Sequence, residues 1–201
     1  MLYSELQCSD AIHKAVERMG FAEMTEIQEK TIPVMMAGYA VIAKAPTGTG
    51  KTCAFGIPVA EHILPENKYP QAVIMAPTRE LAQQIAQELE ELTYFMPEVQ
   101  VACVYGGANM EKQAKRLAEG CQIVVATPGR LMDHYKHHSI DISHVTQIVL
   151  DEADEMLNMG FYKDVRHIIE MMKARKSLSM FSATISREVM DIGWLYQHNA
   201  E

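Results

Sequence analysis

The sequence has no apolar run long enough to cross a membrane. Its longest apolar stretch, residues 31–43, is interrupted by Pro33, whereas a membrane-spanning helix needs about 20 apolar residues. The N-terminal segment has neither a basic flank nor an apolar run, so a secretory signal peptide is not expected. Together these absences predict a cytoplasmic protein.

Paired cysteines and an excess of positive charge are also lacking. The four cysteines are scattered without a C-x-x-C pair, which is typical of a reducing compartment and offers no zinc pattern. A net charge of −8 argues against tight non-specific binding of nucleic acid, because neutralised phosphates dominate that affinity. Any nucleic-acid contact must therefore be local. We interpret the cysteines as small buried side chains: Cys8, Cys53, Cys103 and Cys121.

What is present is a globular composition, with 48% hydrophobic and 22% charged residues in 201 positions, a length that suits a single domain. Six short apolar runs alternate with segments of helical length, which predicts an α/β fold with a parallel β-sheet flanked by helices. The expected strands cover residues 40–43, 72–76, 99–104, 123–126, 148–150 and 178–181. The expected helices cover residues 10–19, 26–36, 51–63, 79–94, 111–118, 163–173 and 187–196.

Each expected strand is followed by a short polar motif. In chain order the motifs are A-P-T-G-T-G-K-T, P-T-R-E-L-A, Y-G-G, T-P-G-R, D-E-A-D and S-A-T. In open α/β sheets, ligands bind outside the carboxyl ends of the strands. We therefore expect the six motifs to converge along one edge of the sheet and to form a working site there.

The first motif, Ala45–Thr52, follows an expected strand and opens an expected helix, as a phosphate-binding loop does. Its glycines let backbone amides surround a phosphate, Lys51 can contact the outer phosphates, and the Thr52 hydroxyl can bind magnesium. Ala45 stands where the strict pattern has glycine. The alternative is a simple glycine–threonine turn between a strand and a helix.

Asp151 and Glu152 add carboxylate oxygens at the end of another expected strand. A nucleoside triphosphatase needs one carboxylate to hold magnesium and another to position or activate water. The pair could instead be the solvated start of the helix expected near Ala153. Its occurrence together with the phosphate loop favours the catalytic interpretation.

Taken in order, the motifs resemble those of the DEAD-box RNA helicases over nearly the whole chain. Besides the phosphate loop and Gly106-Gly107, the likeness rests on G-F-A-E-M-T-E-I-Q at Gly20–Gln28, P-T-R-E-L-A at Pro77–Ala82, T-P-G-R at Thr127–Arg130, D-E-A-D at Asp151–Asp154 and S-A-T at Ser182–Thr184. The resemblance implies an N-terminal RecA-like P-loop NTPase domain of an ATP-dependent RNA helicase, with ATP and Mg²⁺ as cofactors. It also implies that residues 1–28 lead into a core at 37–197.

The resemblance implies that residues near the N-terminus bind the nucleotide base. Gln28 is similar to the glutamine that recognises the adenine edge, Phe21 to the aromatic that stacks on the base, and Thr25 to its supporting partner. Tyr3 stands where the family often has phenylalanine, and Met24 where it usually has proline.

For the phosphates and the metal, the resemblance implies three catalytic residues: Lys51, Asp151 and Glu152. Asp151 and Thr52 would hold magnesium largely through water, and Glu152 would orient or deprotonate the attacking water. The implied ATP contacts of the loop are Thr47, Gly48, Thr49, Gly50, Lys51 and Thr52.

Further positions resemble those that hold RNA in the family. Helix N-termini, hydroxyls, glycine amides and arginines can bind a sugar-phosphate backbone without recognising bases, so sequence preference should be weak. For Arg79 and Arg130, an ion pair within the domain is the alternative. The implied RNA contacts are Pro77, Thr78, Arg79, Gly107, Thr127, Pro128, Gly129 and Arg130. The residues that resemble those coupling the nucleotide state to RNA binding are Asp154, Ser182 and Thr184.

Four histidines crowd residues 134–144 and suggest a metal site. The family has a variable surface loop in this segment, and no regular spacing brings the imidazoles together. We therefore interpret them as solvated loop residues and expect no metal beyond magnesium. They are His134, His137, His138 and His144.

Helicases of this family use a second RecA-like domain with further RNA contacts and arginine fingers. No motif of that domain follows Thr184, so we expect a fragment of a longer helicase that binds nucleotide but hydrolyses it poorly. Two alternatives are a nucleotide-gated RNA or protein clamp without unwinding, and a related ATPase that moves on DNA. ATP-dependent strand release by a longer chain would exclude the first, and the segment around Gln28, characteristic of the RNA branch, disfavours the second.

Overall fold

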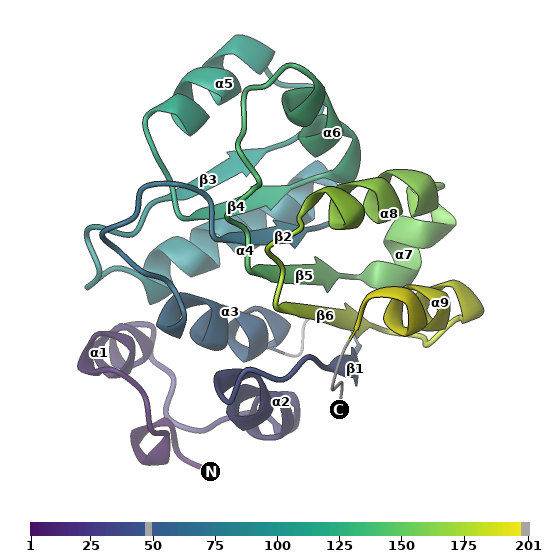
Figure 1. Ribbon diagram of the computed structural model, residues 1–201. Helices are drawn as coiled ribbons and strands as arrows, with labels where there is room; N and C mark the ends of the chain where they lie inside the picture. The colour runs from purple at the N-terminus through teal and green to yellow at the C-terminus, as the bar shows by residue number, and fades with distance from the viewer. Residues whose placement is uncertain (47–49, 198–201) are drawn as a thin grey trace.

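The backbone forms a six-stranded parallel sheet in a computed structural model that describes residues 1–46 and 50–197 (Figure 1). The strand order is β1-β6-β5-β2-β4-β3. The strands are β1 (Ile42–Lys44), β2 (Ala72–Met75), β3 (Val101–Val104), β4 (Ile123–Ala126), β5 (Gln147–Asp151) and β6 (Ser177–Ser182). The predicted α/β class and all six predicted strands are confirmed.

Helices connect the strands and also precede the first one. They are α1 (Asp10–Arg18), α2 (Glu26–Met36), α3 (Lys51–Glu61), α4 (Arg79–Leu92), α5 (Met110–Ala118), α6 (Pro128–Lys136), α7 (Ala153–Asn158), α8 (Tyr162–Met171) and α9 (Arg187–Tyr196), with a short 3₁₀ turn, η1 (Tyr3–Glu5). The seven predicted helices are all confirmed. Within the described part of the chain, no helix is long and apolar enough to span a membrane.

Helix α6 includes residues 134–136, the first part of the segment 134–144 that we interpreted as a surface loop, so that interpretation is wrong for these residues. Pro128 occupies the first turn of the helix, where its missing N–H and fixed φ are tolerated best. Leu131 and His134, three residues apart, both lie on the buried face. The proline and this spacing are signals in the sequence that indicate a helix.

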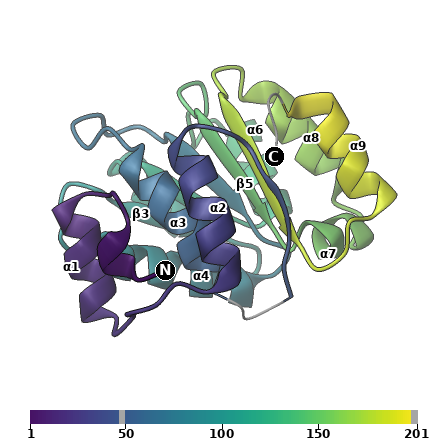
Figure 2. The ribbon, with the colours of Figure 1, turned by 90° about the horizontal axis from the view of Figure 1, so that it is seen from below.

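Both faces of the sheet are covered, because alternate residues of a strand point to opposite sides. In β2, Ala72 and Ile74 belong to the core shared with α2, α3 and α4, whereas Val73 and Met75 belong to the core shared with α6, α7, α8 and α9. Figures 1 and 2 show these two groups of helices on opposite sides of the sheet.

The cysteines are free thiols, and their burial is confirmed only in part. Cys53 and Cys121 are buried, whereas Cys8 and Cys103 are half-buried. Burial raises the pKa of the Cys121 thiol to about 11, which keeps it protonated and poorly reactive at neutral pH.

Candidate active site

The polar motifs lie along one edge of the sheet. Because every pair of neighbouring strands is parallel, the carboxyl ends of all six strands lie at the same edge. Lys44 at the end of β1 is paired with Ser182 at the end of β6. The predicted convergence is confirmed for the described residues. Thr47, Gly48 and Thr49 lie outside those residues.

At this edge Lys51, Asp151 and Glu152 form a cluster in which Lys51 and Asp151 are buried and Glu152 is half-buried. The Lys51 ammonium lies 3.2 Å from Asp151 Oδ1 and 3.7 Å from Glu152 Oε1. Lys51 is 6% exposed and Asp151 is 1% exposed. Lys51 opens α3, and Asp151 ends β5, so the two elements place an ammonium and a carboxylate in contact.

Asp151 has one oxygen that is available for a further ligand. Its Oδ1 accepts a hydrogen bond from the Glu152 backbone amide at 2.9 Å, whereas Oδ2 is buried and has no hydrogen-bond partner among the described residues. Burial raises the pKa of Asp151, against the influence of Lys51. Thr52, the next residue of α3, is also buried. Hard oxygen donors in such a place suit Mg²⁺.

Glu152 has an unusual backbone conformation for a residue with a side chain. Its φ of 48° and ψ of 51° lie in the left-handed region, and it occupies the N-cap position of α7. Such conformations cost about 1–3 kcal/mol and persist where the surrounding structure holds them. The turn places the Glu152 carboxylate on the same side as Lys51.

Gln28 connects the N-terminal segment to the start of α3. Its Nε2 donates to the Gly50 carbonyl at 3.1 Å, and its Oε1 accepts from the Thr25 amide at 3.0 Å and from the Tyr3 hydroxyl. Gly50 has a φ of 75°, and a Cβ there would lie 2.6 Å from Gln28 Nε2. Glycine is thus required at position 50 both by its backbone and by the close approach of Gln28.

The two aromatic residues of the N-terminal segment lie side by side. The rings of Tyr3 and Phe21 are 6.3 Å apart with an interplanar angle of 23°. Tyr3 is buried, whereas Phe21 is 45% exposed. Phe21 therefore presents an accessible aromatic surface, and Tyr3 supports it from within.

Asp154, Ser182 and Thr184 join the first turn of α7 to the end of β6 and the loop that follows it. The Asp154 amide donates to Ser182 Oγ at 3.1 Å, and the Thr184 hydroxyl and amide both donate to Asp154 Oδ2, at 2.8 and 3.0 Å. Burial opposes ionisation of Asp154, but these hydrogen bonds outweigh it and lower its pKa from the usual 3.8. A displacement of the start of α7 would therefore move the loop after β6.

The predicted RNA contacts lie at the starts of α4 and α6 and in the loop after β3. Thr78 caps α4 by accepting from the Leu81 amide at 3.2 Å. The Arg79 guanidinium lies over the Tyr105 ring, 4.7 Å from its centre. Gly107 in the same loop has a φ of 83°. The further members of this group are Pro77, Thr127, Pro128, Gly129 and Arg130.

Arg130 is held by groups within the domain. Its Nη1 donates to the Ala108 carbonyl at 3.0 Å and to Gln113 Oε1 at 3.1 Å. The ion pair considered as an alternative is present, because Nε lies 3.6 Å from the exposed Asp133 carboxylate. These contacts tie α6 to the loop after β3.

His134 lies in a helix, so its interpretation as a solvated loop residue is wrong. It is fully buried in α6, and its Nε2 lies 3.0 Å from Gln113 Oε1. Burial, together with the nearby Arg130 charge, lowers its pKa, because the charged imidazole is disfavoured there. His137, His138 and His144 are exposed, as expected. The residues that the structure describes contain no group of three potential metal ligands.

Two polar residues of the site were missed at the sequence level. Gln113 is 8% exposed and joins Arg130 and His134 to the Tyr105 carbonyl, to which its Nε2 donates at 3.0 Å. Gln113 lies four residues before the buried Leu117, on the same face of α5. A polar side chain on the apolar face of a helix is a signal in the sequence that could have indicated a buried polar contact. Glu88 of α4 is hydrogen bonded to Thr52, and burial raises its pKa.

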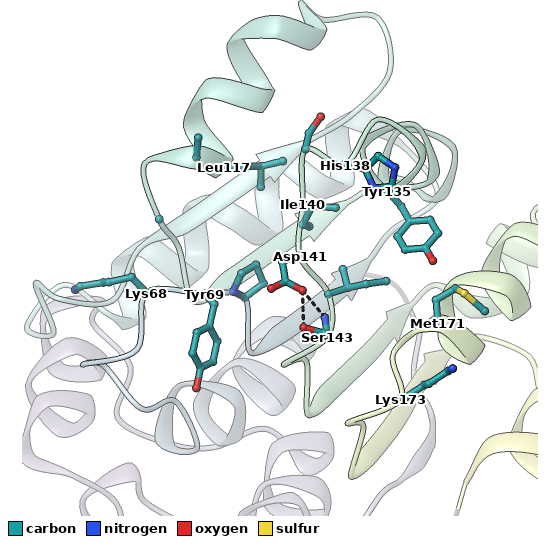
Figure 3. A pocket seen from close by; sticks show the side chains of 15 residues that line it. Lys68, Tyr69, Leu117, Tyr135, His138, Ile140, Asp141, Ser143, Met171 and Lys173 are labelled. Carbon is teal, nitrogen blue, oxygen red and sulfur yellow. Dashed lines mark hydrogen bonds between the residues drawn. The ribbon is translucent and has the colours of Figure 1, made fainter.

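A cavity of about 750 Å³ lies away from the polar edge, near the starts of β2 and β5 (Figure 3). Figure 3 shows Lys68 and Lys173 on opposite sides of it, with Asp141 between them. Asp141 accepts hydrogen bonds from the Ser143 amide and hydroxyl at 2.9 and 2.6 Å. None of the predicted site residues lines this cavity.

The parallel sheet, the lysine that opens α3 and the carboxylate pair that ends β5 together define a RecA-like P-loop nucleoside triphosphatase domain. Comparisons with known proteins narrow this class. The family model described as DEAD/DEAH box helicase matches residues 25–192, and the chain belongs to that family.

Several relatives are similar over nearly the whole chain. The ATP-dependent RNA helicase CshA of Limosilactobacillus reuteri is 47% identical over 100% of this chain and 40% of its own length. The protein of the same name from Listeria monocytogenes is 46% identical over 99% of this chain and 38% of its own length. The crystal structure of a DEAD box protein from Methanococcus jannaschii superposes on this structure with a TM-score of 0.93 and is 40% identical in sequence. The match covers 100% of this chain and 55% of that chain. The chain thus spans about 40% of the length of these curated relatives.

Proposed function

We propose that this chain is the nucleotide-binding half of an ATP-dependent RNA helicase. The observation that carries the proposal is the cluster of Lys51, Asp151 and Glu152 at the polar edge of the sheet. An ammonium and two carboxylates brought together in this way suit the binding of a phosphate–magnesium complex. The names of the curated relatives, ATP-dependent RNA helicases, support the same function.

The residues of the cluster and their neighbours have separate roles in binding ATP and Mg²⁺. Lys51 binds the outer phosphates of ATP, and the Thr52 hydroxyl and Asp151 Oδ2 hold Mg²⁺ largely through water. When bound, the metal neutralises charge on the phosphates. Glu152 orients the attacking water and accepts its proton. Gln28 and Phe21 hold the adenine base.

RNA would bind along the same edge, at the starts of α4 and α6. The amides of these helix ends, the Thr78 hydroxyl and the Arg79 guanidinium present donors suited to a sugar-phosphate backbone. Asp154, Ser182 and Thr184 would pass the nucleotide state on to this surface. A second RecA-like domain of the parent protein would complete both sites, and a cytoplasmic location agrees with the free thiols.

The nucleotide site is tested by removing the lysine charge. Lys51→Met should weaken binding of Mg-ADP by about 10- to 100-fold in calorimetry, the scale of hydrogen bonds to charged groups. Lys14→Met, at an exposed position on α1, is the matched control and should bind as the wild type does. Circular dichroism would confirm that both variants fold. Equal affinities of the two folded variants would place the nucleotide elsewhere.

The helicase activity is tested on a parent chain that contains the second domain. ATP-dependent separation of a short RNA duplex should occur, and it should be lost with Lys51→Met. Nucleotide-dependent RNA binding without strand release would instead indicate a clamp.

A further inference from the structure

The Gln28 carboxamide is nearly saturated with hydrogen bonds. The side chain is 3% exposed. Its Oε1 accepts from the Thr25 amide and from the Tyr3 hydroxyl, and its Nε2 donates to the Gly50 carbonyl. An amide oxygen has two lone pairs, and an amide nitrogen has two hydrogens. Counted over the contacts of the described residues, one N–H therefore remains with which Gln28 can recognise a ligand.

This remaining group does not distinguish the two purines. Adenine presents an exocyclic amine donor beside the N7 acceptor, and a carboxamide binds both when its oxygen and its nitrogen are available. Guanine presents two acceptors there, O6 and N7. With Oε1 filled, Gln28 can donate to N7, which both bases share. The occupancy of Oε1 thus determines how strongly adenine is preferred.

Tyr3 fills the second acceptor position with a single hydroxyl group. Its ring is 5% exposed and packs beside Phe21, so the ring position is set by packing that phenylalanine could provide equally well. The hydroxyl is what phenylalanine lacks. Cys53 on α3 is the neighbouring alternative acceptor for this hydroxyl, and its sulfur is a weak one.

We propose that the Tyr3 hydroxyl is a specificity-determining group that competes with the adenine amine for Gln28 Oε1. This inference rests on the proposed nucleotide site. An adenine nucleotide must displace a buried hydroxyl from its acceptor, whereas a guanine nucleotide leaves that hydrogen bond in place. Tyr3 therefore lowers the affinity for adenine nucleotides selectively and narrows the discrimination between the two purines.

The single-atom substitution Tyr3→Phe tests the competition by calorimetry with ADP and GDP. Removing the hydroxyl should tighten ADP binding by about three- to tenfold, the scale of one neutral hydrogen bond, and leave the GDP affinity unchanged. Tyr39→Phe removes the same atom at an exposed position and should alter neither affinity. In a Gln28→Ala background, Tyr3→Phe should no longer affect ADP binding, because the shared partner is gone.

The possible outcomes separate this inference from the proposed function. If Tyr3 only oriented Gln28 for the base, Tyr3→Phe would weaken ADP binding, and that result would overturn the proposal. An unchanged ADP affinity, or equal tightening of ADP and GDP, would overturn it too. If the wild type bound neither nucleotide, the nucleotide site itself would be refuted, and the inference would fail with it.

Discussion

The ion pair between Lys51 and Asp151 makes the nucleotide site sensitive to single substitutions. Both side chains are almost fully buried, and a buried charge that loses its partner is costly, typically about 3–5 kcal/mol. Glu152 is less buried, at 21% exposed, and lies farther from Lys51. It can therefore be changed with less effect on the fold than its two neighbours.

The first prediction concerns Glu152 in a parent chain with the second domain. Glu152→Gln keeps the size of the side chain but removes the carboxylate that would orient water. RNA-stimulated ATP turnover should fall by about 10² or more, the scale of a positioned acid–base group, while ADP affinity stays close to that of the wild type. Steady-state turnover and calorimetry measure the two quantities. Unchanged turnover would show that another group acts on the water.

A second prediction at the residue scale concerns the base. Since the Gln28 amide contacts the Gly50 carbonyl just before α3, the domain should bind ADP more tightly than GDP, but by less than the roughly three- to tenfold of a full hydrogen bond, because the Tyr3 hydroxyl competes for Gln28 Oε1. Gln28→Ala should reduce this preference, because the polar group that would be left unpaired by the wrong base is gone. Equal dissociation constants for ADP and GDP in both the wild type and Tyr3→Phe would contradict the assignment.

At the scale of elements, α7 and the loop after β6 are joined through one carboxylate. Asp154 accepts both the hydroxyl and the amide of Thr184, across 30 residues of sequence. A second connection, through Gln113 and Arg130, joins α5, α6 and the loop after β3. The polar edge is therefore a set of loops linked to one another and not six independent turns.

The third prediction uses the lowered pKa of Asp154. Burial alone would raise this pKa, but the hydrogen bonds from Thr184 and Ser182 have the larger combined effect, so the pKa is lower in the folded state than the usual 3.8. The ionised carboxylate therefore stabilises the fold at pH values above 3.8. That stabilisation is lost as the pH falls through the folded-state pKa. Thr184→Val should lower the free energy of unfolding by about 0.5–1 kcal/mol at neutral pH, after allowance for solvent screening. The difference between variant and wild type should vanish at pH values well below 3.8. Urea unfolding across this pH range measures it, and a constant difference would disprove the linkage.

The elements were largely predictable from sequence, because the buried strands are short β-branched runs and the helices have clear starts such as Thr25, Thr78 and Ser186. Helix α6 was missed because its last residues fall in the segment 134–144, which was interpreted as the variable surface loop of the family. The partners of Gln28 and Arg130 could not be predicted. The missed partners lie more than 15 residues away, such as Tyr3 for Gln28 and Gln113 for Arg130, and local patterns do not contain such contacts.

At the scale of the whole molecule, an acidic chain is proposed to bind a polyanion. The net charge of −8 repels RNA over long distances, so affinity must come from donors gathered at one edge. Arg79 and Arg130 lie at the starts of two helices on that edge, where helix amides add donors. This arrangement favours local contacts with the backbone and gives little non-specific attraction.

The last prediction follows from this conflict of charge. If one domain contacts roughly three phosphates, the log–log dependence of RNA affinity on salt should have a slope of about −2, since each phosphate on a single strand contributes about 0.7. Single-stranded RNAs of different sequence should bind similarly, because backbone contacts carry no base information. Arg130→Ala should weaken binding to every sequence alike, whereas an arginine that recognises a base would relax the preference at one position. Fluorescence anisotropy with several oligomers and salt concentrations measures all three effects, and strong sequence discrimination that disappears with Arg130→Ala would refute the backbone assignment.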